Sequence, residues 1–194
     1  GSGSLEEDRQ GFNIEEEQHS QLINHICDSG KEVISAYLFD GSKSYLIYRF
    51  SPSQSSTDNF NLQSKGFLQS IGHYWRWASL YCCGSTNAAG KVMGLAAYGD
   101  EKYKNEGEIL SIDNNGEIRL DFEKINQFYK EPNIFSLDLS NSKHHQNVAK
   151  RVQSETENVI LKLLAFLKER FPSDNLYLSG GVALNVVLNE KIKK

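Results

Sequence analysis

Hydrophobic side chains recur at the spacing of an α-helix along much of the chain. The longest such stretch covers residues 143–170, and its apolar stripe is wide enough to bury one face of a long helix. The stripe consists of Val148, Val152, Val159, Leu163 and Phe166, widened by Ala149, Thr156, Ile160 and Leu167. A second helix is predicted at about 65–82, and its aromatic residues are most simply core: Tyr74, Trp75, Trp77 and Tyr81. Shorter helices are predicted over 122–130 and 182–193, and an acidic first turn predicts another that ends near Gly30.

Strand patterns alternate with these helices. Residues 33–39 are almost continuously apolar, as in a strand covered on both faces, and residues 45–50 read as its antiparallel partner across a turn. Residues 108–121 predict a short hairpin with a turn at 113–116. Residues 175–179 predict a short buried strand, which two glycines connect to the last helix. The alternation of strands and helices predicts a mixed α/β fold.

Composition and charge narrow the class of protein. The 194 residues suit one domain, and 39% apolar with 24% charged residues is typical of a globular chain. A net charge of −4 offers no broad basic surface for nucleic acid, and the apolar runs fall far short of the ~18 residues that span a bilayer. Three cysteines without a CxxC pattern suit a reduced, cytoplasmic protein. We interpret residues 1–14 as a linker or tag with an acidic lead-in, and residues 15–194 as the domain.

Two glycine-rich segments are candidates for binding a phosphate or sugar. Gly180 and Gly181 stand between a predicted strand and a helix, where glycines let a ligand approach the backbone and the helix start adds N–H donors. Asn185, one turn later, can reach back to such a ligand, although a tight turn that binds nothing fits the spacing equally well. Residues 87–99 contain Gly90, Lys91 and Gly94. No Ser or Thr follows Lys91, so this is not a Walker A loop, and a solvated lysine on a short helix is the alternative.

Two further places offer metal ligands. Asp40, followed by Gly41, is a carboxylate at a strand end and can hold a hard cation, although ordinary hairpin chemistry explains it as well. His19 lies one helical turn after Glu15, and such a pair can share a metal or form a simple surface pair. The remaining histidines have no obvious partners: His25, His73, His144 and His145.

The order of three segments carries a family resemblance. GKVMGLAAYG at 90–99, a long helix containing AKRVQ at 149–153, and LYLSGGVALNVVLNEKI at 176–192 together resemble the carbamoyltransferase family of nodulation and antibiotic-tailoring O-carbamoyltransferases. The resemblance runs from about residue 15 to the end. It implies part of an actin-like ATPase (ribonuclease H-like) transfer domain, incomplete at both ends. It also implies ATP-dependent transfer of a carbamoyl group from carbamoyl phosphate, through a carbamoyl-adenylate, to a hydroxyl of a small molecule.

The resemblance assigns roles by position. Gly180, Gly181 and Asn185 would contact ATP, and Lys91 with Gly90 and Gly94 would line its phosphate and carbamoyl side. Lys91 and Asp40 would be the catalytic residues, with Gly41 beside the nucleotide. Asp40, Glu15 and His19 would hold a divalent metal, magnesium or iron. Residues 15–19 align with an HxxxH metal motif of the family, in which Glu15 replaces the first histidine.

Alternatives remain open at this point. The substitution at Glu15 favours a non-catalytic interaction or scaffold piece that keeps the fold, and a sugar or acetate kinase of the same superfamily is a third interpretation. The expected partners are a small hydroxyl acceptor and carbamoyl phosphate, without nucleic acid or membrane. A homodimer, or a second chain that completes the site, is left open.

Overall fold

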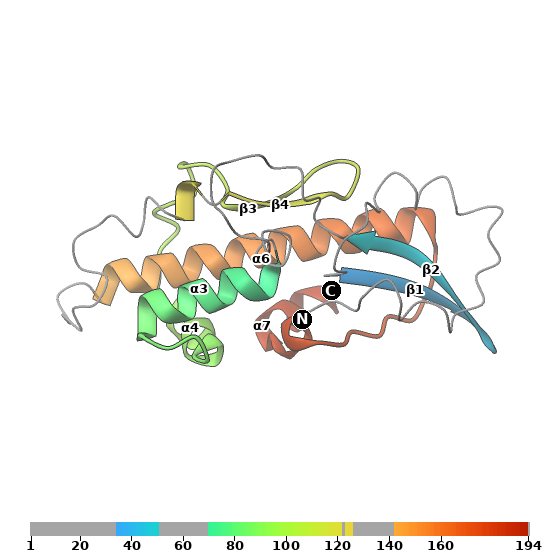
Figure 1. Ribbon diagram of the computed structural model, residues 1–194, viewed down its shortest axis with the longest axis horizontal. Helices are drawn as coiled ribbons and strands as arrows, with labels where there is room; N and C mark the ends of the chain where they lie inside the picture. Colours follow the sequence, from blue (N-terminus) through green and yellow to red (C-terminus); the bar gives the residue numbers. More distant parts are fainter. Residues whose placement is uncertain (1–33, 51–69, 122, 126–141, 194) are drawn as a thin grey trace, which may run out of the picture. The chain divides into compact units, whose positions relative to one another are not determined.

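The structure is a computed structural model that describes residues 34–50, 70–121, 123–125 and 142–193 (Figure 1). The chain divides into two compact units, Gly1–Ser70 with Ala165–Leu176, and Ile71–Leu164 with Tyr177–Lys194. Helices and two small antiparallel sheets occur together in the described residues, which confirms the predicted mixed α/β fold. The helix predicted before Gly30 lies outside the described residues, as does most of the helix predicted over 122–130, of which 123–125 are helical.

The first unit contains the predicted hairpin. Strands β1 (Ile34–Asp40) and β2 (Lys43–Phe50) pair antiparallel around the loop Gly41-Ser42. Gly41 has a φ of 59° at the first loop position, the pattern of a type II′ hairpin turn. The residues from Leu46 to Phe50 are buried, whereas β1 is half-buried or exposed. The prediction that β1 is covered on both faces is therefore wrong, because side chains on both faces of β1 keep access to solvent.

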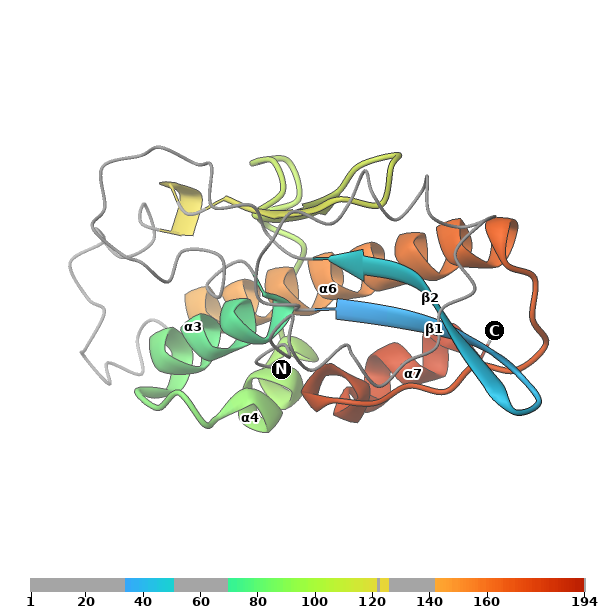
Figure 2. The ribbon, with the colours of Figure 1, turned by 45° about the vertical axis from the view of Figure 1, so that its right-hand side comes forward.

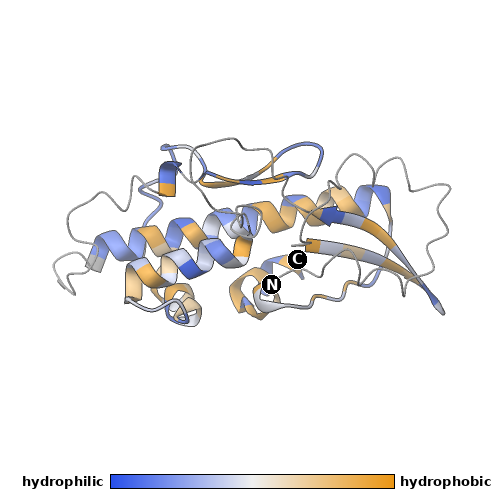
Figure 3. Cartoon of the chain, viewed as in Figure 1, coloured by the Kyte–Doolittle hydropathy of each residue, from blue (hydrophilic) through white to orange (hydrophobic). Residues whose placement is uncertain are grey.

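Helix α6 (Ser142–Arg170) confirms the longest predicted helix and forms the core of the second unit as far as Leu164. Its apolar stripe is fully buried at Val148, Val152 and Val159. Lys168 and Arg170 in the last turn complement the negative end of the helix dipole. Hydrophobic and hydrophilic residues alternate around α6 in Figure 3, as an amphipathic helix requires.

Helix α3 (Ile71–Cys83) runs alongside α6 in both views (Figures 1 and 2). The four aromatic residues predicted as core are buried, which confirms that prediction. Trp75 Nε1 donates a hydrogen bond of 3.0 Å to Thr156 Oγ1 on α6. The polar edge of an otherwise apolar ring is thus satisfied inside the protein, and the contact fixes α3 on α6.

Short elements complete the second unit. Helix α4 (Ala89–Ala96) packs on α3, and strands β3 (Leu110–Ile112) and β4 (Ile118–Leu120) form the predicted second hairpin. At its turn, Asp113 Oδ1 accepts from the backbone N–H groups of Asn115 and Glu117, both at 2.9 Å. No helix among the described residues is long and apolar enough to cross a membrane.

The C-terminal segment differs from its prediction. Residues 175–179 are irregular and exposed, with Tyr177 at 88%, so the predicted buried strand is wrong. A strand needs a neighbour for its backbone groups, and no described strand lies next to this segment in either sheet. The helix predicted over 182–193 is divided in two: a 3₁₀ turn η3 (Gly181–Leu184) and helix α7 (Val186–Ile192).

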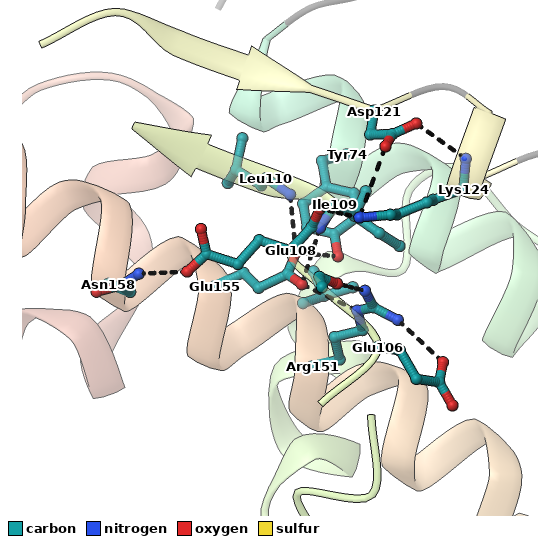
Figure 4. A network of polar contacts seen from close by, with 12 residues as sticks. Tyr74, Glu106, Glu108, Ile109, Leu110, Asp121, Lys124, Arg151, Glu155 and Asn158 are labelled. Carbon is teal, nitrogen blue, oxygen red and sulfur yellow. Dashed lines mark hydrogen bonds and ion pairs between the residues drawn. The ribbon is translucent and has the colours of Figure 1, made fainter. Parts of the chain in front are cut away.

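Glu155 anchors the second unit through a buried polar network (Figure 4). Its Oε1 accepts from the backbone N–H of Ile109 at 3.0 Å and from Arg151 Nε at 2.9 Å. Its Oε2 accepts from the Tyr74 hydroxyl at 2.8 Å and from the N–H of Leu110 at 2.9 Å. Burial raises the pKa of Tyr74 well above its usual range, and the Glu155 charge adds to that shift. One carboxylate therefore joins α3, α6 and the first residue of β3.

Gly99 marks the closest approach of the segment after α4 to α6. A Cβ on Gly99 would lie 2.1 Å from the backbone oxygen of Gln146 and 2.6 Å from Lys150 Cβ. We expect Gly99→Ala to lower the free energy of unfolding by about 1–3 kcal/mol, because backbone must move to admit the methyl group. Urea unfolding measures this loss. Gly94→Ala is the control, since its Cβ would have no heavy atom within 4 Å, and a stability equal to or above wild type is expected there. Equal stabilities of the Gly99 variant and wild type would contradict the close approach.

Candidate functional site

The first glycine-rich segment forms an exposed strip on α4. Gly90 and Gly94 are four residues apart and so lie on the same face of the helix. Both are exposed, and a Cβ added at either would have no heavy atom within 4 Å. Lys91, also exposed, stands next to this strip in the first turn. The backbone of α4 is therefore accessible from solvent beside a cation.

The second glycine-rich segment forms the turn that leads into η3. Gly180 has a φ of 97°, a conformation that favours glycine, and both Gly180 and Gly181 are exposed. A Cβ at either position would again have no heavy atom within 4 Å. The first N–H groups of a helical turn have no acceptor within that turn. The turn thus offers accessible donors without a side chain in the way.

Helix α3 brings the two segments together within the second unit. It contacts both α4 and η3, although these elements are far apart in the sequence. Beyond α4, the charges of Lys150 and Lys191 help lower the pKa of exposed Glu101, after the larger effect of its hydrogen bond to Lys104. Cations of α6 and α7 thus contribute to the electrostatic field at this exposed carboxylate.

Asn185 has its side chain inside the protein. Its Oδ1 accepts from the backbone N–H of Leu188 at 3.0 Å, which makes Asn185 the N-cap of α7. Its Nδ2 donates to Gln153 Oε1 at 2.9 Å, and Gln153 Nε2 donates back to Oδ1 at 3.2 Å. The structure thus gives the Asn185 side chain a capping role, and its predicted contact with a nucleotide stays a prediction.

Comparison with known proteins places this arrangement in a family. The family model of the carbamoyltransferase N-terminus matches residues 29–194. The chain belongs to the carbamoyltransferase N-terminal family. The uncharacterized protein sll1178 of Synechocystis sp. is 31% identical over an alignment of 116 residues, and the match covers 53% of this chain and 19% of that protein. The chain therefore matches about a fifth of the length of this curated relative. The family predicted from the sequence motifs is confirmed.

The metal ligands predicted for this carbamoyltransferase N-terminal chain are not assembled in the described residues. Asp40 ends β1 and Gly41 follows it, and both residues are exposed in the first unit. Glu15 and His19 lie outside the described residues. Within the described ranges, no group of three or more His, Cys, Asp or Glu side chains could hold a metal ion. The metal site stays a prediction.

His144 has partners that the sequence does not indicate. Its Nε2 lies 2.7 Å from the Tyr81 hydroxyl and its Nδ1 lies 2.5 Å from the Tyr103 hydroxyl. The three residues come from α3, the segment after α4, and the start of α6. No local motif joins positions so far apart, so only the fold reveals this cluster. It ties three elements of the second unit together by hydrogen bonds.

The neighbouring thiols Cys82 and Cys83 are half-buried at the end of α3. Burial raises the pKa of Cys82 to about 12, and its Sγ lies 3.7 Å from the backbone oxygen of His145. Burial also raises the pKa of Cys83, while the charge of Lys91 partly opposes the shift. Neither thiol is favoured as a thiolate near neutral pH.

Proposed function

We propose that the chain is the nucleotide-binding part of an ATP-dependent O-carbamoyltransferase. The reaction would transfer a carbamoyl group from carbamoyl phosphate, through a carbamoyl-adenylate, to a hydroxyl of a small molecule in the cytoplasm. Membership of the family supports carbamoyl transfer in general. The actin-like architecture, the nucleotide and the acceptor belong to the proposal.

One observation carries the assignment of the nucleotide site. Two exposed, glycine-rich segments contact the same helix, and Lys91 stands beside one of them. Gly90, Gly94, Gly180 and Gly181 all leave their Cβ positions open. A phosphate chain needs accessible N–H donors, a nearby cation and room to approach the backbone. All three requirements are met by residues of the second unit.

Backbone donors and one cation would contact different parts of the bound nucleotide. The backbone at Gly180 and Gly181 would donate hydrogen bonds to phosphate oxygens at the start of η3. The strip of Gly90 and Gly94 would let the phosphate and carbamoyl groups pass close to α4, and the Lys91 ammonium would balance their negative charge. These groups hold and orient the reactants, because a fixed arrangement of donors and one cation lowers the entropy lost on reaction.

The proposal includes a divalent metal that is bound by Asp40. Asp40, with Glu15 and His19, would hold magnesium or iron, since carboxylates suit hard cations and imidazole suits iron. When bound, the metal would polarise the carbonyl of the carbamoyl group. The side chain of Asp40 is exposed and therefore accessible for this role.

Lys91→Ala tests the charge in this site. We expect its affinity for ATP with Mg²⁺ to fall about tenfold, because a charge-assisted hydrogen bond to phosphate is lost. Isothermal titration measures the change. Lys104→Ala is the matched control, since Lys104 is exposed and pairs with Glu101 at 3.0 Å, and we expect wild-type affinity there.

The outcomes separate the proposal from its alternatives. Equal ATP affinities of wild type and the Lys91 variant would remove Lys91 from the site. No ATP binding by the wild-type chain would favour the non-catalytic interaction piece. A phosphorylated acceptor, in place of a carbamoylated one, would favour the kinase interpretation.

A further inference from the structure

We propose that Gln153 on α6 is a positioning residue for the Gly180–Gly181 turn, and that it acts through Asn185. The inference rests on the proposed function, which assigns the nucleotide phosphates to this turn. It adds a residue that touches no reactant and yet sets the geometry of the phosphate-binding backbone.

Asn185 stands at the junction that fixes the turn. Its backbone N–H donates to Val182 oxygen at 3.0 Å and so closes η3. Its side chain caps α7, and its backbone oxygen accepts from Asn189 N–H at 3.0 Å. Asn189 Nδ2 also donates back to Ala183 oxygen at 2.8 Å. Any shift of Asn185 is therefore passed to η3, which begins at Gly181.

Gln153 holds this junction from α6. The two amides exchange a reciprocal pair of hydrogen bonds of 2.9 and 3.2 Å, with Gln153 4% and Asn185 7% exposed. Gly180 and Gly181 would have no heavy atom within 4 Å of their Cβ positions. The glycine turn is thus open to solvent at its Cβ positions, and the hydrogen bonds between Gln153 and Asn185 hold its C-terminal end.

The chemistry of the neighbours fixes the orientation of both amides. The atom of Asn185 that faces the Leu188 N–H must be an oxygen, because an N–H donates. The atom of Gln153 that lies 2.6 Å from Glu157 Oε1 must be the Nε2 donor, because a carboxylate accepts. Glu157 is buried and also pairs with Lys191 of α7. A flip of either amide would place acceptor against acceptor or donor against donor, so the link has a single arrangement.

Two variants break this link in different ways. Asn185→Asp keeps the oxygen that caps α7 and removes the donor to Gln153 Oε1. Gln153→Glu removes the donor to Asn185 and Glu157. Asn158→Asp is the control, because it adds the same charge to α6 at a residue whose side chain donates to exposed Glu108, away from the Gln153–Asn185 link.

The experiment compares these variants in two measurements. The first records the backbone amide resonances of Gly180 and Gly181 in the ¹⁵N-labelled 194-residue chain without nucleotide. The second determines affinities for ATP with Mg²⁺ and for adenosine by titration calorimetry. We expect both linked variants to move the two glycine resonances and to bind ATP about tenfold more weakly, the equivalent of one lost buried hydrogen-bond partner. The affinity of both linked variants for adenosine should equal that of wild type. The Asn158→Asp control should match wild type in its glycine resonances and in both affinities.

Two results would overturn the inference. Glycine resonances and ATP affinity equal to wild type in Asn185→Asp would overturn the inference. So would equal losses for ATP and adenosine, since a general structural role predicts both. If Gln153→Glu does not fold, Asn185→Asp decides, because its cap is kept. If wild type binds no ATP, the proposed function fails, and the glycine resonances alone decide whether Gln153 positions the turn.

Discussion

Glu155→Gln is expected to lower the free energy of unfolding by about 3–5 kcal/mol, the cost of removing one partner from a buried ion pair. The carboxylate of Glu155 accepts four hydrogen bonds, from three different elements. Glutamine has one acceptor oxygen, so its NH₂ group would face donors. The buried guanidinium of Arg151 would lose its ion pair with Glu155, in which Nε lies 2.9 Å from Oε1.

Urea unfolding followed by circular dichroism measures this loss. Glu108→Gln is the matched control, because the side chain of exposed Glu108 accepts one described hydrogen bond, of 3.0 Å, from Asn158 of α6. We expect its stability to stay within about 0.5 kcal/mol of wild type. A Glu155 variant as stable as the Glu108 variant would show that the network in Figure 4 does not hold the second unit together.

Gly181→Val is expected to remove ATP binding while leaving the fold intact. The added side chain would have no heavy atom within 4 Å of its Cβ, and the φ of Gly181 is not in the left-handed region, so the protein tolerates the residue. In the proposed function, however, the same open space admits the phosphates to the backbone. Two methyl groups there would hold phosphate oxygens beyond hydrogen-bond distance, and we expect a loss of about a hundredfold or more in affinity.

Titration calorimetry with ATP and Mg²⁺, together with a thermal melt, separates binding from folding. Gly181→Ala provides a graded control, since one methyl group should cost less affinity than the branched side chain. An unchanged melt with lost binding is the predicted pattern. Wild-type ATP affinity in the valine variant would exclude this turn as the phosphate site.

Local patterns in the sequence predict the elements that carry their own periodicity. The stripe on α6 and the aromatic residues of α3 specify helices because their spacing alone defines a buried face. The two hairpins follow from turn residues between apolar runs. The strand predicted at 175–179 has the composition of a strand, but strand formation depends on a neighbour, which no local pattern contains.

Part of the candidate site can likewise be predicted from local sequence, and part depends on the fold. The exposed glycines and Lys91 can be predicted because glycine and charge are visible in the sequence. Their shared contact with α3 cannot, since it depends on packing between distant segments. The sequence predicts a ligand contact for Asn185, with a tight turn that binds nothing as the alternative. The structure assigns the cap, because Gln153 lies on another element at the right distance.

The binding of ATP to the glycine segments of the second unit can be mapped directly by NMR. The ¹⁵N-labelled chain is titrated with ATP and Mg²⁺, and the backbone amide resonances are followed. The proposed site predicts that Gly90, Gly94, Gly180 and Gly181 shift together, along with Lys91, at one common affinity. Shifts confined to the exposed lysines around Glu101, or no shift at these glycines at saturating ATP, would contradict it.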